Sequence, residues 1–418
     1  MKKSFGFIGI LIFVLLMVPT LRIHAAETIK VGCILPLTGA LASYGQAMKK
    51  GAEFGVDLIN KKYDFDTIGA KWEGIPGLGG AKIELIFADD QGKPEIGMAE
   101  AERLINQQKV VAILGSYASG VTNTISPVCE RNKIPILTIS TATSLSQRGF
   151  KYFFRVTANA EQGIEPLMDF IEEYYKKNNL KMKGVGLMME DTTSGVDNGK
   201  MFVNISEKKG WKILCNVSYG HATMDLTSEC QKVIAADPDV LFQMPYTSDG
   251  ILQVKTLKKF GWLPKIMLYG GGANDDPKFH EALGKDTDYI SERIVWSLDL
   301  TKTKKVTAEV NTAYKKFSGV DLDPNNVRYI TTLQVLAEAL NRAKSTDSEK
   351  LRAALETADI PEGDLVLMHG VKFNPKTHDN LRVISGVGQR KDGYIYTIWP
   401  EKFATMKYVY PMTPWSKR

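Results

Sequence analysis

Small polar side chains gather directly after several apolar runs of this sequence, where strands are expected to end. Ser119 opens a helical segment that follows one run, and the segment 140–144 after another carries four hydroxyls, including those of Thr141 and Thr143. A helix N-terminus offers N–H groups without acceptors and a partial positive charge, which suits a carboxylate ligand. A plain helix cap is the alternative for Ser119 alone. Several such loops together favour a binding site.

Matching loops follow other apolar runs. Residues 37–39 (Leu-Thr-Gly), with Tyr44 a few positions later, follow the apolar run 29–35. Further along the chain lie 190–195, which includes Ser194, and 246–249, which begins with Tyr246. Ligands of open α/β sheets bind outside the carboxyl ends of strands. The ring of Tyr246 could cover a ligand, and an ordinary surface tyrosine is the alternative.

Catalytic patterns are missing. The segment 115–120, Gly-Ser-Tyr-Ala-Ser-Gly, has the geometry of a phosphate-binding loop, but the Lys-Ser/Thr pair of that motif does not follow it. No glycine-rich dinucleotide pattern follows the first strand, and no G-x-S-x-G turn occurs. None of the five histidines forms an i, i+4 pair, so each is expected at the surface or as a cap. We therefore expect no enzyme, no cofactor and no metal site.

Strands and helices alternate along the chain, which predicts parallel sheets with helices on both faces. The first set of elements runs to about 156, where 152–156 is expected to be a link, and a second set begins at 163. Helical periodicity returns at 306–317, 326–343 and 348–357, and 387–399 is expected to form a hairpin. The glycine-rich segment 63–80 is expected to be a long loop without a readable function.

The N-terminus resembles a secretory signal peptide at 1–26, with Lys2 and Lys3, an apolar run, and small residues before the expected cut. A membrane anchor is the alternative, although the run is shorter than the roughly 20 residues of a bilayer span. The segment contains three basic residues, Lys2, Lys3 and Arg22, so its removal would lower the formal charge from +6 to +3. We expect a periplasmic protein, and a charge this small does not favour nucleic acid as a partner.

An oxidising compartment permits disulfides, and Cys215 and Cys230 are the best-placed pair among the four cysteines. Four buried free thiols are the alternative.

The sequence resembles the periplasmic leucine/isoleucine/valine-binding proteins, type I solute-binding proteins of ABC importers. The resemblance covers nearly the whole mature chain and is most specific at 29–60 and 115–149, with further likeness at 225–241 and 329–344. It implies two doubly wound parallel-sheet lobes, joined by a three-stranded hinge with crossings near 155, 296 and 373. The N-terminal lobe would comprise 27–155 and 297–373, and the C-terminal lobe 156–296 and 374–418.

The resemblance also implies roles for individual residues. Ser119 and the loop from Thr141 to Thr143 match the positions that hold a ligand carboxylate, and Tyr44 matches a tyrosine of the same wall. The second lobe would add Ser194 and Tyr246.

One position departs from the family pattern. Amino-acid-binding members carry an acid after the strand that ends here at Tyr269, where it pairs with the ligand ammonium, but this sequence has glycines at 270–272. Asp191, Asp275 and Asp276 are the acids that could compensate. Both a branched-chain or related amino acid and an amine-free carboxylic acid therefore remain open as ligands.

These observations predict a monomeric extracytoplasmic solute-binding protein that closes on a small carboxylate-bearing ligand and delivers it to the permease of an ABC importer. A ligand-sensing module of a receptor system is the alternative, since the same fold can serve both purposes.

Overall fold

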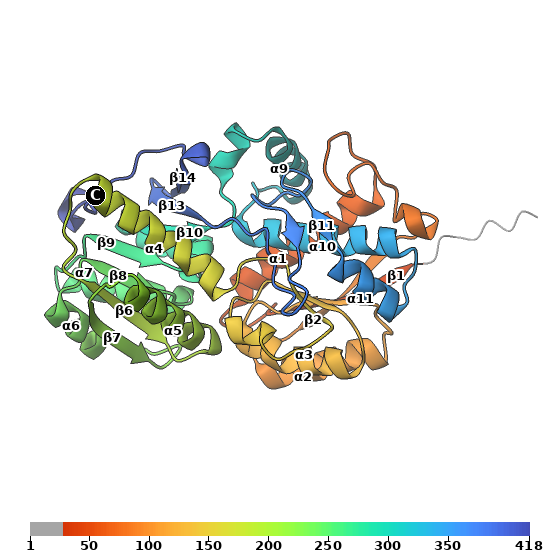
Figure 1. Cartoon of the computed structure of the whole chain (residues 1–418), viewed down its shortest axis with the longest axis horizontal. Helices are drawn as coiled ribbons and strands as arrows, with labels where there is room; N and C mark the ends of the chain where they lie inside the picture. The colour runs from red at the N-terminus through yellow and green to blue at the C-terminus, as the bar shows by residue number, and fades with distance from the viewer. Residues whose placement is uncertain (1–27) are drawn as a thin grey trace, which may run out of the picture.

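Two separate β-sheets organise the computed structural model, which describes residues 28–418 (Figure 1). The expected signal peptide lies outside the described residues. Each sheet is flanked by helices, and the two α/β lobes lie side by side along the long axis (Figure 1). The expectation of two α/β lobes is confirmed. Among residues 28–418, no helix combines the length and the apolar character that a membrane span requires.

The first lobe contains a fully parallel five-stranded sheet in the order β2-β1-β3-β4-β5. Its strands are β1 (Ile29–Leu35), β2 (Ile83–Asp89), β3 (Ile113–Gly115), β4 (Ile136–Thr138) and β5 (Phe153–Arg155). This order places a topological switch point between β1 and β3, where ligands of such sheets bind.

The second lobe contains a seven-stranded sheet in the order β14-β13-β10-β9-β8-β6-β7. Its strands are β6 (Val185–Glu190), β7 (Ile213–Tyr219), β8 (Val240–Gln243), β9 (Ile266–Tyr269), β10 (Ser291–Ile294), β13 (Gly386–Lys391) and β14 (Tyr394–Trp399). The strands from β6 to β10 are parallel and repeat the order of the first sheet, with a second switch point between β6 and β8. The hairpin β13–β14 adds an antiparallel edge.

The helices cover both faces of the sheets. They are α1 (Ala42–Asn60), α2 (Pro94–Asn106), α3 (Ser119–Arg131), α4 (Ala160–Lys177), α5 (Thr193–Lys208), α6 (Thr227–Ala236), α7 (Thr247–Lys259), α8 (Pro277–Leu283), α9 (Lys305–Ser318), α10 (Pro324–Ala343) and α11 (Ser348–Glu356). The short pair β11 (Asp359–Ile360) and β12 (Val371–Lys372) completes the fold.

Segments distant in sequence share a lobe. The late helices α10 and α11 lie with α1 and β1 in one lobe, whereas β13 and β14 lie beside β10 in the other (Figure 1). Helix α10 is buried along most of its length against α1. The chain therefore passes between lobes more than once, and the exact crossing points near 155, 296 and 373 stay a prediction.

One sequence-based expectation needs correction. Residues 153–155 are not a simple link but strand β5, because Phe153 and Phe154 are buried and pair with β4. The glycine-rich loop is folded onto α10, where the N–H of Gly77 donates to Oδ1 of Asn341 at 2.7 Å.

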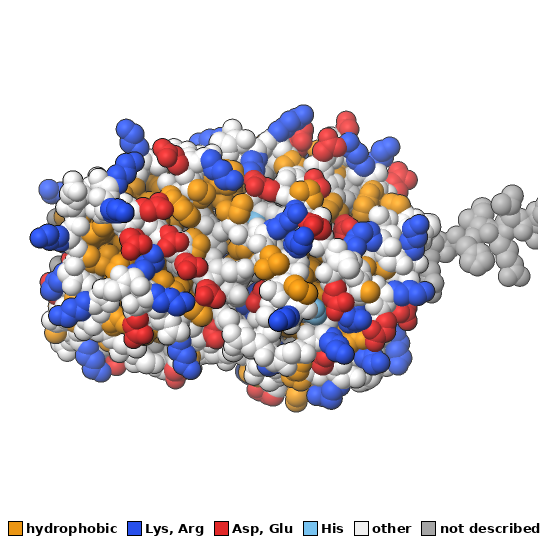
Figure 2. All heavy atoms as spheres, viewed as in Figure 1, with side chains coloured by type: hydrophobic (Ala, Val, Ile, Leu, Met, Phe, Trp, Pro, Cys, Tyr) orange, Lys and Arg blue, Asp and Glu red, His pale blue; other side chains and the backbone are white. Residues whose placement is uncertain are grey.

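All four cysteines are free thiols, so Cys215 and Cys230 are not bridged. On the face shown in Figure 2, side chains of both signs are interspersed over both lobes.

Candidate ligand-binding site between the lobes

A small cavity of about 40 Å³ lies between the lobes, lined by loops from the carboxyl ends of strands in both sheets. Five hydroxyl side chains, two tyrosines, three charged residues and several apolar groups form its wall. They are Tyr117, Ser119, Ile139, Thr141, Thr157, Ala158, Thr192, Ser194, Met244, Tyr246, Gly272, Asp275, Arg293, Val295 and Arg328. Both topological switch points thus contribute to one site.

The predicted residues Ser119, Thr141 and Ser194 lie together in this wall. Oγ1 of Thr141 and Oγ of Ser194 are 3.3 Å apart, which joins the first lobe to the second. The amide of Asn198 donates to Oγ1 of Thr141 at 3.3 Å. Helices α3 and α5 begin at these loops, and the first N–H groups of a helix have no intrahelical acceptors.

Ser119 is not the helix cap that its position predicts. Ala118 occupies the N-cap, and no side chain caps the helix. The hydroxyl oxygen of Ser119 instead accepts from the N–H of Ala142 at 3.3 Å. This contact ties α3 to the loop after β4 and leaves the hydroxyl proton of Ser119 available for a ligand.

A buried arginine fixes the loop that carries Thr141. The guanidinium of Arg155, fully buried, donates to the carbonyls of Thr141 at 3.0 Å and Ala142 at 2.7 Å. Its Nε lies 3.3 Å from Oδ1 of Asp379. Because both carbonyl contacts come from one rigid planar group, they set the backbone direction of this loop.

Three tyrosines, one from helix α1 and two from loops, form an aromatic cluster at the cavity. Tyr117 and Tyr246 line the wall and their ring centroids are 6.0 Å apart. Tyr44 was expected in the same wall, but it is not one of the residues that line the cavity. It stacks behind Tyr117, with centroids 4.6 Å apart, and its hydroxyl lies 2.7 Å from Oγ1 of Thr247 in the other lobe. Tyr44 therefore supports the wall and the contact between lobes.

Thr143 also lies outside the cavity wall, contrary to the prediction. Its backbone N–H donates to Oδ2 of Asp197 at 2.6 Å, and the N–H of Ser144 donates to Oδ1 of the same residue at 3.3 Å. Asp197 belongs to α5 of the second lobe. The loop after β4 therefore has two contacts of different kinds. Thr141 lines the cavity, and the backbone of Thr143 binds Asp197 of the other lobe.

The charged residues of the wall were missed by sequence reasoning. Arg328 of α10 pairs with Asp275 at 2.9 Å across the lobes, and both side chains are almost fully buried. Arg293 of β10 is 5 % exposed, and its guanidinium makes no hydrogen bond or ion pair with any residue of 28–418. A charged pair, Glu292 and Arg293, inside a short buried strand is the signal that could have found it, because charged groups are rarely buried without a purpose.

The glycines after β9 make room for this arginine. A Cβ at Gly271 would lie 3.0 Å from Nη2 of Arg293, and a Cβ at Gly163 of α4 would lie 2.6 Å from Nη1. The glycines at 270–272 stand where the resemblance leads us to expect an acid, and Gly271 borders the guanidinium of Arg293. Burial, and next the charge of Arg328, lower the pKa of Arg293 to about 10, so it remains charged at neutral pH.

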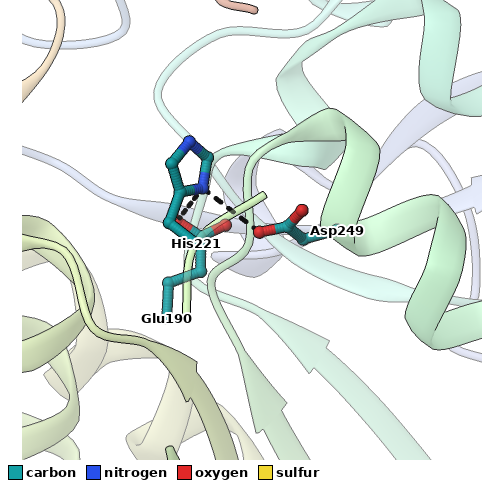
Figure 3. Close-up of side chains that lie close together, drawn as sticks. All are labelled: Glu190, His221 and Asp249. Carbon is teal, nitrogen blue, oxygen red and sulfur yellow. Dashed lines mark hydrogen bonds and ion pairs between the residues drawn. The ribbon is translucent and has the colours of Figure 1, made fainter. Parts of the chain in front are cut away.

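A further cluster lies beside Tyr246, where Glu190 and Asp249 are buried under His221 (Figure 3). Nδ1 of His221 is 3.2 Å from Oε2 of Glu190 and 3.2 Å from Oδ2 of Asp249. The hydrogen bond with Asp249, followed by that with Glu190, raises the pKa of His221 to about 10. The side chain of His221 is 29% exposed, so it keeps a surface side in addition to its two buried partners.

The same cluster supports the cavity wall. The second carboxylate oxygen of Glu190 accepts the N–H of Tyr246, so it holds the backbone of a wall residue. One histidine and two carboxylates also match the donor set of a divalent cation. In this structure the three side chains contact one another directly, and we describe the cluster as an ion-pair cluster on that geometry.

Two α/β lobes that enclose a polar cavity at paired switch points are the architecture of a solute-binding protein of the periplasmic class. Comparison with known families agrees, because the model described as "Periplasmic binding protein" matches residues 28–386. The chain belongs to this family, whose members act outside the cytoplasm.

Individual relatives are distant but similar over their full length. Leu/Ile/Val-binding protein homolog 7 of Brucella suis biovar 1 is 24% identical over 388 residues, 91% of this chain and 93% of the relative. The leucine-binding protein LivK of Thermotoga maritima has a TM-score of 0.75 at 21% identity, covering 88% of this chain and 97% of that one. A solute-binding protein of an ABC transporter from Rhodopseudomonas palustris BisB5 has a TM-score of 0.72 at 21% identity, covering 94% and 99%.

Proposed function

We propose that this protein binds a small carboxylate-bearing ligand outside the cytoplasm and delivers it to the permease of an ABC importer. The observation that carries this proposal is the meeting of the N-termini of α3 and α5 at the hydroxyls of Ser119, Thr141 and Ser194. Neutral donors and two helix N-termini stabilise a carboxylate without a full counter-charge.

The acids near the cavity favour a ligand without an amine. Asp275 is already neutralised by Arg328. Asp276 accepts hydrogen bonds from Ser43 at 2.6 Å and Thr247 at 2.5 Å, and Asp191 accepts the N–H of His221 at 3.0 Å. No acid of the wall is left to pair with an ammonium group, so we favour an amine-free carboxylic acid over an α-amino acid.

The known ligands of similar proteins share this carboxylate. The Rhodopseudomonas palustris BisB5 protein was crystallised with 3,4-dihydroxybenzoic acid, and LivJ of Streptococcus pneumoniae with isoleucine. These ligands differ in the amine and agree in the carboxylate, which supports our choice of the anchored group.

A ligand screen followed by two matched variants tests the proposal. The mature protein is screened by thermal shift against carboxylic acids, amino acids and neutral analogues, since a tight ligand raises the melting temperature. Affinity for the best acid is then measured by calorimetry with Thr141→Val and with Thr143→Val as the control. The first variant should weaken binding by about tenfold, because a hydrogen bond to a charged group is worth roughly 1.5–3 kcal/mol. The control, whose hydroxyl lies outside the wall, should bind normally.

Two results would contradict the proposal. Either the best ligand lacks a carboxylate, or both threonine variants bind it as tightly as the unchanged protein. The delivery step is tested separately, by uptake of the same acid in cells that lack this protein.

A further inference from the structure

Arg293 is the one charged residue of the cavity wall without a partner among residues 28–418. The wall contains two arginines and one aspartate, and Arg328 is paired with Asp275. The cavity therefore has one uncompensated positive charge, and Nε of Arg293 is buried without an acceptor. Leaving a buried ionised group unpaired is costly, so an anion is the expected complement.

This charge is separate from the hydroxyl cluster. Arg293 comes from β10 and borders Gly163 and Gly271 of the second lobe. The hydroxyls of Ser119 and Thr141 come from the first lobe and contact Ser194 and Asn198 of α5. Neither group of contacts includes a member of the other, so the wall presents two distinct places for an acidic group.

We propose that the ligand is a short dicarboxylate, with one carboxylate at the hydroxyls of Ser119 and Thr141 and the other at the guanidinium of Arg293. This inference rests on the proposed function and adds a second acidic end to the ligand. A guanidinium binds a carboxylate through two parallel N–H···O bonds, which gives direction as well as affinity. Gly163 and Gly271 provide the space for that planar group, and a side chain at either position would intrude on it.

The test compares diacids with their own half-esters. Linear diacids from butanedioate to hexanedioate and the benzene dicarboxylates are titrated by calorimetry, each beside its monomethyl ester, which removes one charge and adds one methyl group. Each diacid that binds should bind at least about tenfold more tightly than its half-ester. In Arg293→Gln this preference should disappear, whereas Arg293→Lys should retain part of it.

A control arginine separates ligand binding from folding. Arg148 hydrogen-bonds to Leu145 and Ser126 away from the wall. The variant Arg148→Gln should prefer diacids over half-esters as strongly as the unchanged protein does. Melting temperatures without ligand show whether each variant is folded. Should Arg293→Gln fail to fold, the half-ester comparison on the unchanged protein still decides the question.

The possible failures are distinguishable. Half-esters that bind as tightly as diacids, or a loss in Arg293→Gln that is equal for both, would overturn the dicarboxylate and leave the carboxylate receptor standing. Binding of none of the diacids would also overturn it. Binding of neutral analogues in preference to every acid would contradict both proposals.

Discussion

Replacing His221 by Gln should make the stability of this protein respond to pH in a way that the unchanged protein does not. Glu190 and Asp249 are 1 % and 0 % exposed, and the imidazole of His221 is the cation between them. Gln can donate a hydrogen bond but brings no charge. The variant therefore keeps two buried carboxylates side by side and loses their counter-charge.

The pKa of His221 sets the sign and the size of this effect. It is raised from the ordinary 6.5 to about 10, so the stabilisation is complete below about pH 6.5 and is lost as the pH rises through about 10. A shift of this size sets a ceiling of about 5 kcal/mol, at about 1.4 kcal/mol for each pH unit. The side chain of His221 is 29% exposed, and water screens the charges, so we expect about 2 kcal/mol.

Urea unfolding of both proteins at several pH values measures this. The free energy of unfolding of the unchanged protein minus that of His221→Gln should be largest near pH 6 and fall by about 2 kcal/mol toward pH 10. Titrating groups that do not interact with His221 are common to both proteins and cancel in the difference.

His369→Gln is the matched control. Burial lowers the pKa of His369 to about 4, so this histidine is neutral throughout the alkaline range. The free energy of unfolding of the unchanged protein minus that of His369→Gln should stay constant above about pH 7.5. A constant difference for His221→Gln over the same range would refute the ion-pair assignment.

Three further changes have defined outcomes. Asp197→Asn weakens the contact between the lobes, so stopped-flow measurements should show ligand release faster by about tenfold. Arg155→Met leaves Asp379 buried without its cation and should lower the free energy of unfolding by about 3 kcal/mol in urea titrations, and a loss below about 1 kcal/mol would contradict its role. Gly51→Ala places a Cβ 2.4 Å from a backbone oxygen of α10 and should cost about 1–3 kcal/mol, whereas Gly120→Ala, with its nearest contact at 3.4 Å, should melt normally.

Much of the architecture could be predicted from the sequence, because strand and helix periodicities are local. The alternation of apolar runs and helical segments predicted two parallel-sheet lobes, and hydroxyls at strand ends predicted Ser119, Thr141 and Ser194 in one crevice. Ser119 and Thr141 follow from chain direction, since parallel strands of one sheet end at the same edge, whereas Ser194 of the other lobe was implied by the family resemblance. Thr143 and Tyr44 satisfied the same rule without reaching the wall.

Tertiary structure alone decided which charges are paired. Arg328 and Asp275 are 53 residues apart and neutralise one another, while Arg293 beside them has no partner within 28–418. His221 meets Glu190 and Asp249 only because β6 and β8 are neighbours in the sheet and the loops after β6, β7 and β8 converge. The sequence determined where the ligand could bind, through local periodicity. The charge that we propose for the ligand rests on the three-dimensional balance of buried ions, because pairing and desolvation depend on neighbours that no local pattern specifies.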